Sequence, residues 1–238
     1  MLALTLIRLC AREINDVHFA RVALDAASAV VQTGAIGQNW LDLLNDAQRA
    51  VVLVRPDAGS SVENQVLVAG SKQTLAAGTL RILGVTRNMG ANGTTPGKVI
   101  TLASRDDVDA INEDWHSATQ ATPVDQVIYD DKKAPTVFFV DPPSPGTWYI
   151  ELELSKTPTD VTNPTAGNIT IADIYAGPMQ AWMLHRCYAM ATQSVGHFQR
   201  AQFYFQSFFQ QLGVKLKAEM FGGAESQHTL PSTGGVSG

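Results

Sequence analysis

The chain has 238 residues, of which 45% are hydrophobic and 16% are charged, and its formal net charge is −5. This composition argues against disorder over most of the length, and the negative charge argues against general nucleic-acid binding. Two cysteines, Cys10 and Cys187, exclude a disulfide framework and a cysteine-based zinc site. No apolar run reaches the roughly 18 residues of a membrane span, and residues 1–7 are too short for a signal peptide. We therefore expect a soluble, intracellular protein that assembles with other subunits.

The first part of the chain, to about residue 54, has a helical pattern. Asn15 or Asp16 can cap a helix that continues to Val31. A second helix begins near residue 38, and its apolar residues recur at helical spacing on one face: Trp40, Leu43, Leu44, Ala47, Val51 and Val54. Arg55 precedes a proline, which disfavours the helical conformation and ends this helix.

The middle part changes to the pattern of short strands. Six segments are rich in β-branched and aromatic residues and are bounded by Gly, Pro, Asn or Asp: residues 66–69, 79–87, 99–103, 127–129, 136–140 and 148–154. A short helix with an acidic start fits residues 107–115. Strands at this spacing predict an antiparallel sandwich or barrel, and residues 157–165 form a stiff polar connector.

The last part returns to helix. One helix is expected from Asp173 to about residue 192, and Ser194 can cap another that ends at Gly213. The stripe of this second helix comprises Phe198, Ala201, Phe205, Phe208 and Leu212. The predicted fold is thus α+β, with a helical bundle built from residues 1–54 and 169–221, an inserted antiparallel β-sandwich or barrel-like domain at 55–168, and a flexible tail at 222–238.

The sequence lacks the motifs of an enzyme. Between Gly90 and Lys98, a glycine-rich loop has the wrong spacing for a phosphate-binding loop and lies between strands. The five histidines form no metal-binding pair, and no nucleophile has a recognisable signature. We expect no catalytic activity, no metal and no cofactor.

Charge is distributed unevenly along the chain. Residues 106–131 contain eight acidic residues and no Lys or Arg, and the expected acidic patch comprises Asp106, Asp107, Asp109, Glu113 and Asp114. Residues 174–218 contain four basic residues and no acidic ones. Both segments could be solvated faces of a monomer, or they could meet different partners.

In the basic C-terminal segment, the aromatic residues favour contact with a partner over a solvated face. Seven of them fall within residues 198–221, more than one helix face can bury, so some should contact a neighbouring subunit. The expected interface with a neighbouring subunit or another partner comprises Arg186, Arg200, Phe205, Phe209, Val214, Lys215, Leu216, Lys217, Met220 and Phe221. Residues 214–221 are expected to be disordered in the free monomer and ordered on docking.

Short motifs spread along the chain resemble those of a known family. They are Leu-Asn-Asp-Ala-Gln-Arg (44–49), Arg-Pro-Asp-Ala (55–58), Ala-Gly-Ser-Lys-Gln-Thr-Leu (69–75), Val-Thr-Arg-Asn (85–88), Tyr-Asp-Asp (129–131), Phe-Phe-Val-Asp-Pro-Pro (138–143) and Ile-Ala-Asp-Ile-Tyr (171–175). In this order, over about residues 12–213, the chain is similar to the head-to-tail adaptor proteins of short-tailed bacteriophages, the family that resembles tail tubular protein A.

The resemblance implies a structural virion protein, made in the host cytoplasm and located in the neck between capsid and tail. It implies a homo-oligomeric ring of roughly twelve copies that binds the portal protein and the tail tube or nozzle protein. Double-stranded DNA would pass through its channel during ejection, and no membrane is involved. Two alternatives stay open: a tail tube or tail-terminator component, and a carbohydrate-binding or depolymerising tail protein that uses Trp115, Tyr129, Trp148 and Tyr149.

Overall fold

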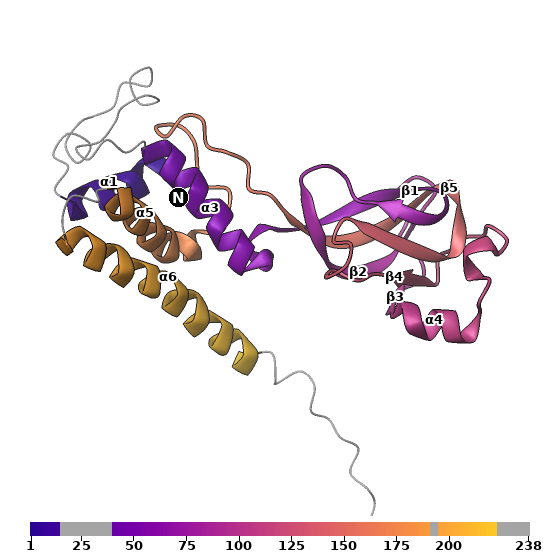
Figure 1. Ribbon diagram of the computed structural model, residues 1–238. Coiled ribbons are helices and arrows are strands. Elements are labelled where there is room, and N and C mark those ends of the chain that lie inside the picture. The colour runs from indigo at the N-terminus through magenta and orange to yellow at the C-terminus, as the bar shows by residue number, and fades with distance from the viewer. Residues whose placement is uncertain (15–39, 191–194, 223–238) are drawn as a thin grey trace, which may run out of the picture. The chain divides into compact units, whose positions relative to one another are not determined.

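The computed structural model describes residues 1–14, 40–190 and 195–222, with side chains described as far as Gly213. The chain divides into two compact units (Figure 1). Unit 1 comprises Met1–Ala47, Asn163–Ala166 and Ile174–Gly238, and unit 2 comprises Gln48–Thr162 and Gly167–Asp173. None of the helices in the described ranges is long and apolar enough to cross a membrane.

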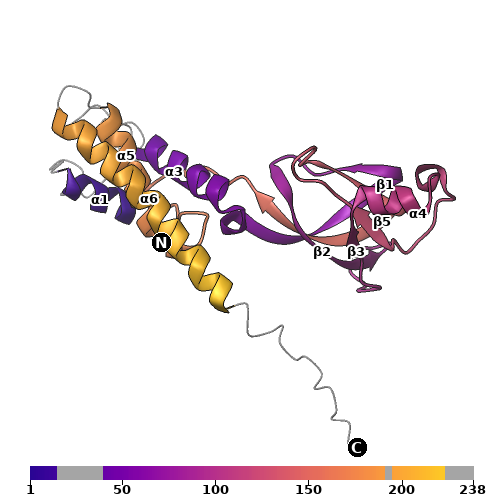
Figure 2. The ribbon, with the colours of Figure 1, turned by 60° about the horizontal axis from the view of Figure 1, so that its bottom comes forward.

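Unit 1 is helical. Its elements are α1 (Ala3–Glu13), the first half of α3 (Trp40–Val54), α5 (Ala176–Met190) and α6 (Val195–Gly222). A single turn of 3-10 helix at Asp173–Tyr175 leads into α5. Helix α5 packs against both α1 and α6, as the two views in Figures 1 and 2 show. The buried side chains include Leu6, Ile7, Cys10, Trp40, Leu44, Met183, Cys187, Phe208 and Leu212.

The helix predicted around Trp40 is confirmed. It ends at Val54, before Arg55-Pro56, and Trp40 is 1% exposed. The apolar stripe drives this helix into the core, as amphipathic spacing requires. The helix predicted from residue 15 or 16 to 31, the Ser194 cap and most of the predicted tail lie outside the described residues.

Helix α6 is longer than the sequence predicted. It continues through Gly213 to Gly222, so Gly213 is not a C-cap, and residues 214–221 are helical in the single chain instead of disordered. A glycine inside a helix costs only about 1 kcal/mol relative to alanine. The residues that follow it, Lys215 to Met220, are good helix formers and include no proline, so the helix continues.

Unit 2 is built on one five-stranded sheet, which confirms the α+β fold class. The strands are β1 (Ser60–Thr74), β2 (Thr79–Gly90), β3 (Thr101–Ala103), β4 (Gln126–Ile128) and β5 (Val137–Lys156). Strand β5 pairs antiparallel with β1, β2 and β4. Short helical elements are Pro56–Gly59, α4 (Arg105–Ile111) and Trp115–Ser117. The core of the sheet includes Leu67, Phe138, Val140, Ile150, Leu152 and Leu154.

Three details of the β region differ from the prediction. The expected strands 136–140 and 148–154 are one strand, β5, which continues through three prolines that sequence reasoning interprets as a break. Register shifts at Leu67/Ala69 and Gly70/Lys72 of β1 accommodate this irregular stretch. Strands β3 and β4 are parallel, so the sheet is mixed, and the predicted helix at 107–115 ends at Ile111.

One buried polar side chain connects several parts of unit 2. Asn88 is 1% exposed, and its amide nitrogen donates to the carbonyl oxygens of Lys98 (2.9 Å) and Val124 (2.8 Å). Its amide oxygen accepts from the Val124 N–H (2.9 Å) and from Nε1 of Trp148 (2.8 Å). The side chain thus uses its full hydrogen-bonding capacity, and it joins β2 and β5 to the two loops beside them.

Candidate functional site

Helix α6 presents an apolar face to solvent. Ala201, Phe208 and Leu212 are buried, whereas Phe198, Phe205 and Phe209 are 63%, 41% and 43% exposed. Positions 198, 205 and 209 differ by seven and four residues, so they lie on one side of the helix. The sequence placed all of these residues except Phe209 on one apolar stripe. In the structure that stripe is buried only at Ala201, Phe208 and Leu212, whereas Phe198 and Phe205 are exposed, and the sequence had also placed Phe205 in the expected interface.

This aromatic face rests on a fixed layer of α5. The ring centroid of Phe205 is 5.0 Å from that of His185, 6.3 Å from that of Trp182 and 5.0 Å from that of Phe209. The indole N–H of Trp182 donates to Asp46 of α3 (2.8 Å). Phe205 and Phe209 thus contact rings of α5 and α6 that are themselves packed or hydrogen-bonded, while part of each ring stays exposed. We call Phe198, Phe205 and Phe209 the α6 aromatic face.

The two predicted interface arginines lie in the same helical unit. Arg186 is half exposed and its Nε lies 3.3 Å from a carboxylate oxygen of Asp46. Arg200 donates to the hydroxyl of Tyr188 (3.2 Å), and its guanidinium lies 5.6 Å from the centroid of that ring. The other predicted interface residues, Val214, Lys215, Leu216, Lys217, Met220 and Phe221, belong to the last turns of α6, beyond the described side chains.

A second tyrosine ties α6 to the N-terminal helix. The hydroxyl of Tyr204 donates to Glu13 of α1 (2.9 Å). Burial, together with this carboxylate, raises the pKa of Tyr204 well above its ordinary value. Phe203, next to it, is 65% exposed but lies on a different side of α6 from the aromatic face.

The predicted acidic patch separates into two kinds of residue. Asp106, Asp107, Glu113 and Asp114 are exposed, and their carboxylates make no ion pair with any residue that the structure describes. Asp109 accepts a hydrogen bond from Nε1 of the fully buried Trp115 (2.7 Å) and another from Arg105 (3.4 Å). The bond from Trp115 lowers the pKa of Asp109. Asp109 therefore organises the local structure, whereas the other four remain available to a partner.

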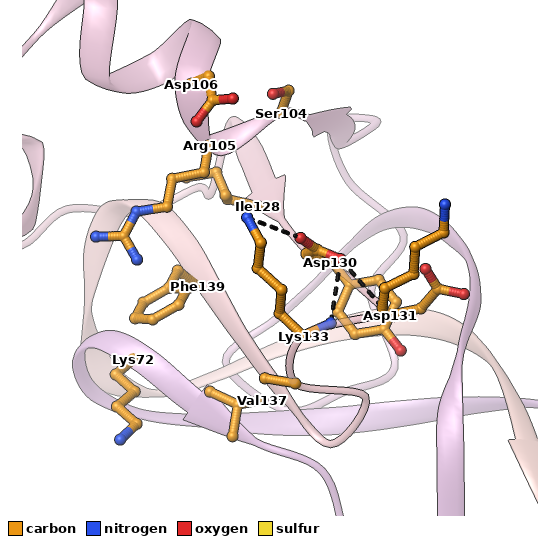
Figure 3. Close-up of a pocket in the computed structure, with 13 residues that line it drawn as sticks. Lys72, Ser104, Arg105, Asp106, Ile128, Asp130, Asp131, Lys133, Val137 and Phe139 are labelled. Atoms are coloured by element: carbon orange, nitrogen blue, oxygen red, sulfur yellow. Dashed lines mark hydrogen bonds and ion pairs between the residues drawn. The ribbon is translucent and has the colours of Figure 1, made fainter.

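A cavity of about 680 Å³ lies beside these residues in unit 2 (Figure 3). Its charged lining comes from three segments that are distant in sequence: Lys72, Arg105, Asp106, Asp130, Asp131, Lys132 and Lys133. Within it, Lys133 lies 3.4 Å from Asp130. Sequence reasoning interprets residues 130–133 as a charged turn and misses the cavity, because only the sheet brings β1, α4, this turn and β5 together.

The structure supplies little for a catalytic or carbohydrate-binding interpretation. Across the described ranges, no group of three His, Cys, Asp or Glu side chains could hold a metal ion. Trp115 is fully buried, and Trp148 is half-buried with its indole N–H bound to Asn88. These tryptophans do not form the exposed aromatic surface that carbohydrate binding requires.

Comparison with known proteins gives one informative match. A search of curated proteins finds no match to the chain. The sequence model of the SU10 adaptor protein family matches residues 1–228, which includes the bundle, the inserted sheet and the acidic patch. The chain therefore belongs to the SU10 adaptor protein family, a family of phage head-to-tail adaptors.

Proposed function

We propose that this chain forms a ring of roughly twelve copies in the virion neck, between the portal and the tail, and that double-stranded DNA passes through the ring. Membership of an adaptor family supports a structural role with portal and tail components. The α6 aromatic face is the observation that carries the proposal, because it supplies a surface for a protein partner.

Three exposed phenylalanines in one row have the composition of an interface core. Aromatic residues are enriched in such cores, because they bury a large area with little loss of side-chain entropy. The same spacing continues in the sequence beyond these residues. Leu216 and Met220 lie seven and eleven residues after Phe209, just as Phe205 and Phe209 lie seven and eleven residues after Phe198. A row of this kind fits into a groove of the portal or of an adjacent subunit.

The exposed acidic residues fit the passage of DNA. Asp106, Asp107, Glu113 and Asp114 carry charges that no described residue neutralises. Carboxylates on a channel wall would repel DNA phosphates, so the genome would not adhere during transit. In this proposal these four residues line the channel or contact the tail, and Asp109 does neither.

The test compares two variants that change different faces of α6. Purified protein is mixed with portal rings, and binding is measured by light scattering after size-exclusion chromatography and by negative-stain imaging. Phe205→Ser combined with Phe209→Ser should leave the protein folded and abolish ring formation on the portal. Phe203→Ser removes a more exposed phenylalanine from another face, and this variant should assemble normally.

Two results would reverse this assignment. If the double variant decorates portal rings at normal occupancy, the docking surface lies elsewhere. If the wild-type chain stacks into tubes without portal, the alternative of a tail tube component is correct.

A further inference from the structure

The cavity in unit 2 shares only Asp106 with the residues that the proposed function uses. Its volume of about 680 Å³ falls within the range of sites that hold small ligands or peptide side chains. Its apolar floor includes the buried Ile128 and the half-buried Val137 and Phe139. Charged side chains surround this floor (Figure 3).

The ring of Phe139 is held in one position. It makes edge contacts with Trp115 (5.9 Å between centroids) and His116 (5.2 Å), and those two rings stack on each other at 3.6 Å. The Nδ1 atom of His116 lies 3.0 Å from the hydroxyl of Ser71 on β1. A ring fixed in this way offers a preorganised apolar surface, which lowers the entropic cost of binding.

Two cationic side chains flank this ring. The guanidinium carbon of Arg105 lies 5.6 Å from the centroid of Phe139. Lys72 is the β1 residue directly opposite Phe139 in the sheet register, is exposed, and has no ion-pair partner among the described residues. Figure 3 shows Phe139 between these two side chains. A carboxylate bound to both cations would bring an apolar group attached to it onto the ring.

The charged side chains that line the pocket favour a peptide ligand over a nucleic acid. Four cations, Lys72, Arg105, Lys132 and Lys133, line the pocket together with three carboxylates, Asp106, Asp130 and Asp131. Duplex DNA carries one negative charge per about 1.7 Å of its axis, so it would place phosphates against these carboxylates. A peptide with a single carboxylate meets the two cations and avoids that repulsion.

We propose that this pocket docks a peptide segment of a partner protein in which one carboxylate lies next to an apolar side chain. Lys72 and Arg105 bind the carboxylate, and the apolar side chain covers Phe139. Asp109 is a positioning residue, because it holds Trp115 beneath Phe139 and accepts a hydrogen bond from Arg105. The inference concerns unit 2 alone and does not depend on the α6 aromatic face.

The experiment uses a random dodecapeptide library selected against the full-length protein. Enriched peptides are labelled with fluorescein, and their affinities are measured by fluorescence anisotropy. We expect Asp or Glu beside an aromatic or branched residue, and a loss of about tenfold or more in affinity for Lys72→Ala and for Arg105→Ala. Lys98→Ala is the matched control, since Lys98 is an exposed lysine outside the pocket that pairs with Asp125 (2.7 Å), and it should bind peptide normally.

A double-mutant comparison tests the role of Asp109. Asp109→Asn keeps an acceptor for Trp115 but removes the charge beside Arg105, so it should weaken peptide binding only when Arg105 is present. An equal effect in the Arg105→Ala background would overturn the positioning role.

Three outcomes would overturn the docking proposal itself. These are a selection that enriches no acidic peptide, enriched peptides that bind Lys72→Ala as tightly as wild type, and binding of a short DNA duplex that Lys72→Ala abolishes. The last result would assign the pocket to nucleic acid.

Discussion

Replacing Asn88 with leucine should unfold unit 2 selectively. Leucine has nearly the same shape but cannot hydrogen-bond, so it leaves the N–H and C=O of Val124 and the indole N–H of Trp148 without their partner. The Lys98 carbonyl keeps a partner, because it also accepts from the Asn88 backbone N–H (2.9 Å). Each buried group left unpaired costs about 1–3 kcal/mol. The indole of Trp148 is half-buried and can reach water, so we expect a total loss of about 3–5 kcal/mol.

Hydrogen exchange measured by mass spectrometry can assign this loss to one unit. A loss of 3 kcal/mol corresponds to exchange that is more than about a hundredfold faster in amides that open with the sheet. Peptides from β2 and β5 should lose protection, and peptides from α5 should keep it. Asn92→Leu, at an exposed asparagine, is the control and should change protection less than about tenfold. Unchanged protection of β5 in Asn88→Leu would show that these four hydrogen bonds do not stabilise the sheet.

Three further predictions address the bundle, the sheet and the end of α6. Trp40→Ala should cost about 3–5 kcal/mol and yield insoluble or unassembled protein; a soluble variant with an unchanged melting temperature would contradict the burial of this side chain. A hydrogen bond from Lys156 lowers the pKa of Glu63, so the stability from this pair is present at neutral pH and is lost as the pH falls through the lowered pKa. Glu63→Gln should therefore reduce the acid dependence of unfolding measured by circular dichroism. A pH profile identical to that of the wild type would refute this prediction. Truncation after Gly213 should leave a folded chain that no longer binds the portal. Removal of residues 223–238 alone should have little effect in the same binding assay. If the shorter chain binds the portal at normal occupancy, the docking surface lies on the helix around Trp182 instead.

The sequence predicts secondary structure best where a single hydrophobic periodicity determines it. The stripe that begins at Trp40 leaves no alternative to a buried helix, and the change to β-branched segments after residue 60 correctly predicts an inserted sheet. Prediction from the sequence fails where strand pairing or the helix propensity of neighbouring residues overrides a local signal. Three prolines within β5 indicate a break, yet pairing with β1 and β4 on either side keeps the strand continuous. Gly213 indicates a helix end, yet the residues after it have sufficient helix propensity to continue.

The candidate sites were predictable only in part. Composition indicates that the aromatic residues near the C-terminus exceed what one helix face can bury, and Phe205 and Phe209 were expected at the interface. The single stripe drawn from the sequence does not indicate that Phe198 and Phe205 are exposed while Ala201, Phe208 and Leu212 are buried. Charge counting places Asp109 in an acidic patch, whereas the structure gives it two hydrogen bonds within unit 2. No one-dimensional pattern joins Lys72 to Phe139, because their proximity depends on the register of β1 against β5.

The position of β5 as the shared partner of β1, β2 and β4 has a consequence for how the chain is made. These strands precede it in the sequence, so β4 can complete its pairing only after residue 141 has emerged from the ribosome. Strands β1 and β2 must wait for residues 155 and 156. Helix α1 likewise waits for α5, which is translated later still. Domains usually fold as units during synthesis at about 5–20 residues per second. This chain instead exposes strand edges until about two-thirds of it has been made, and its yield should depend on chaperones that bind extended segments during that interval.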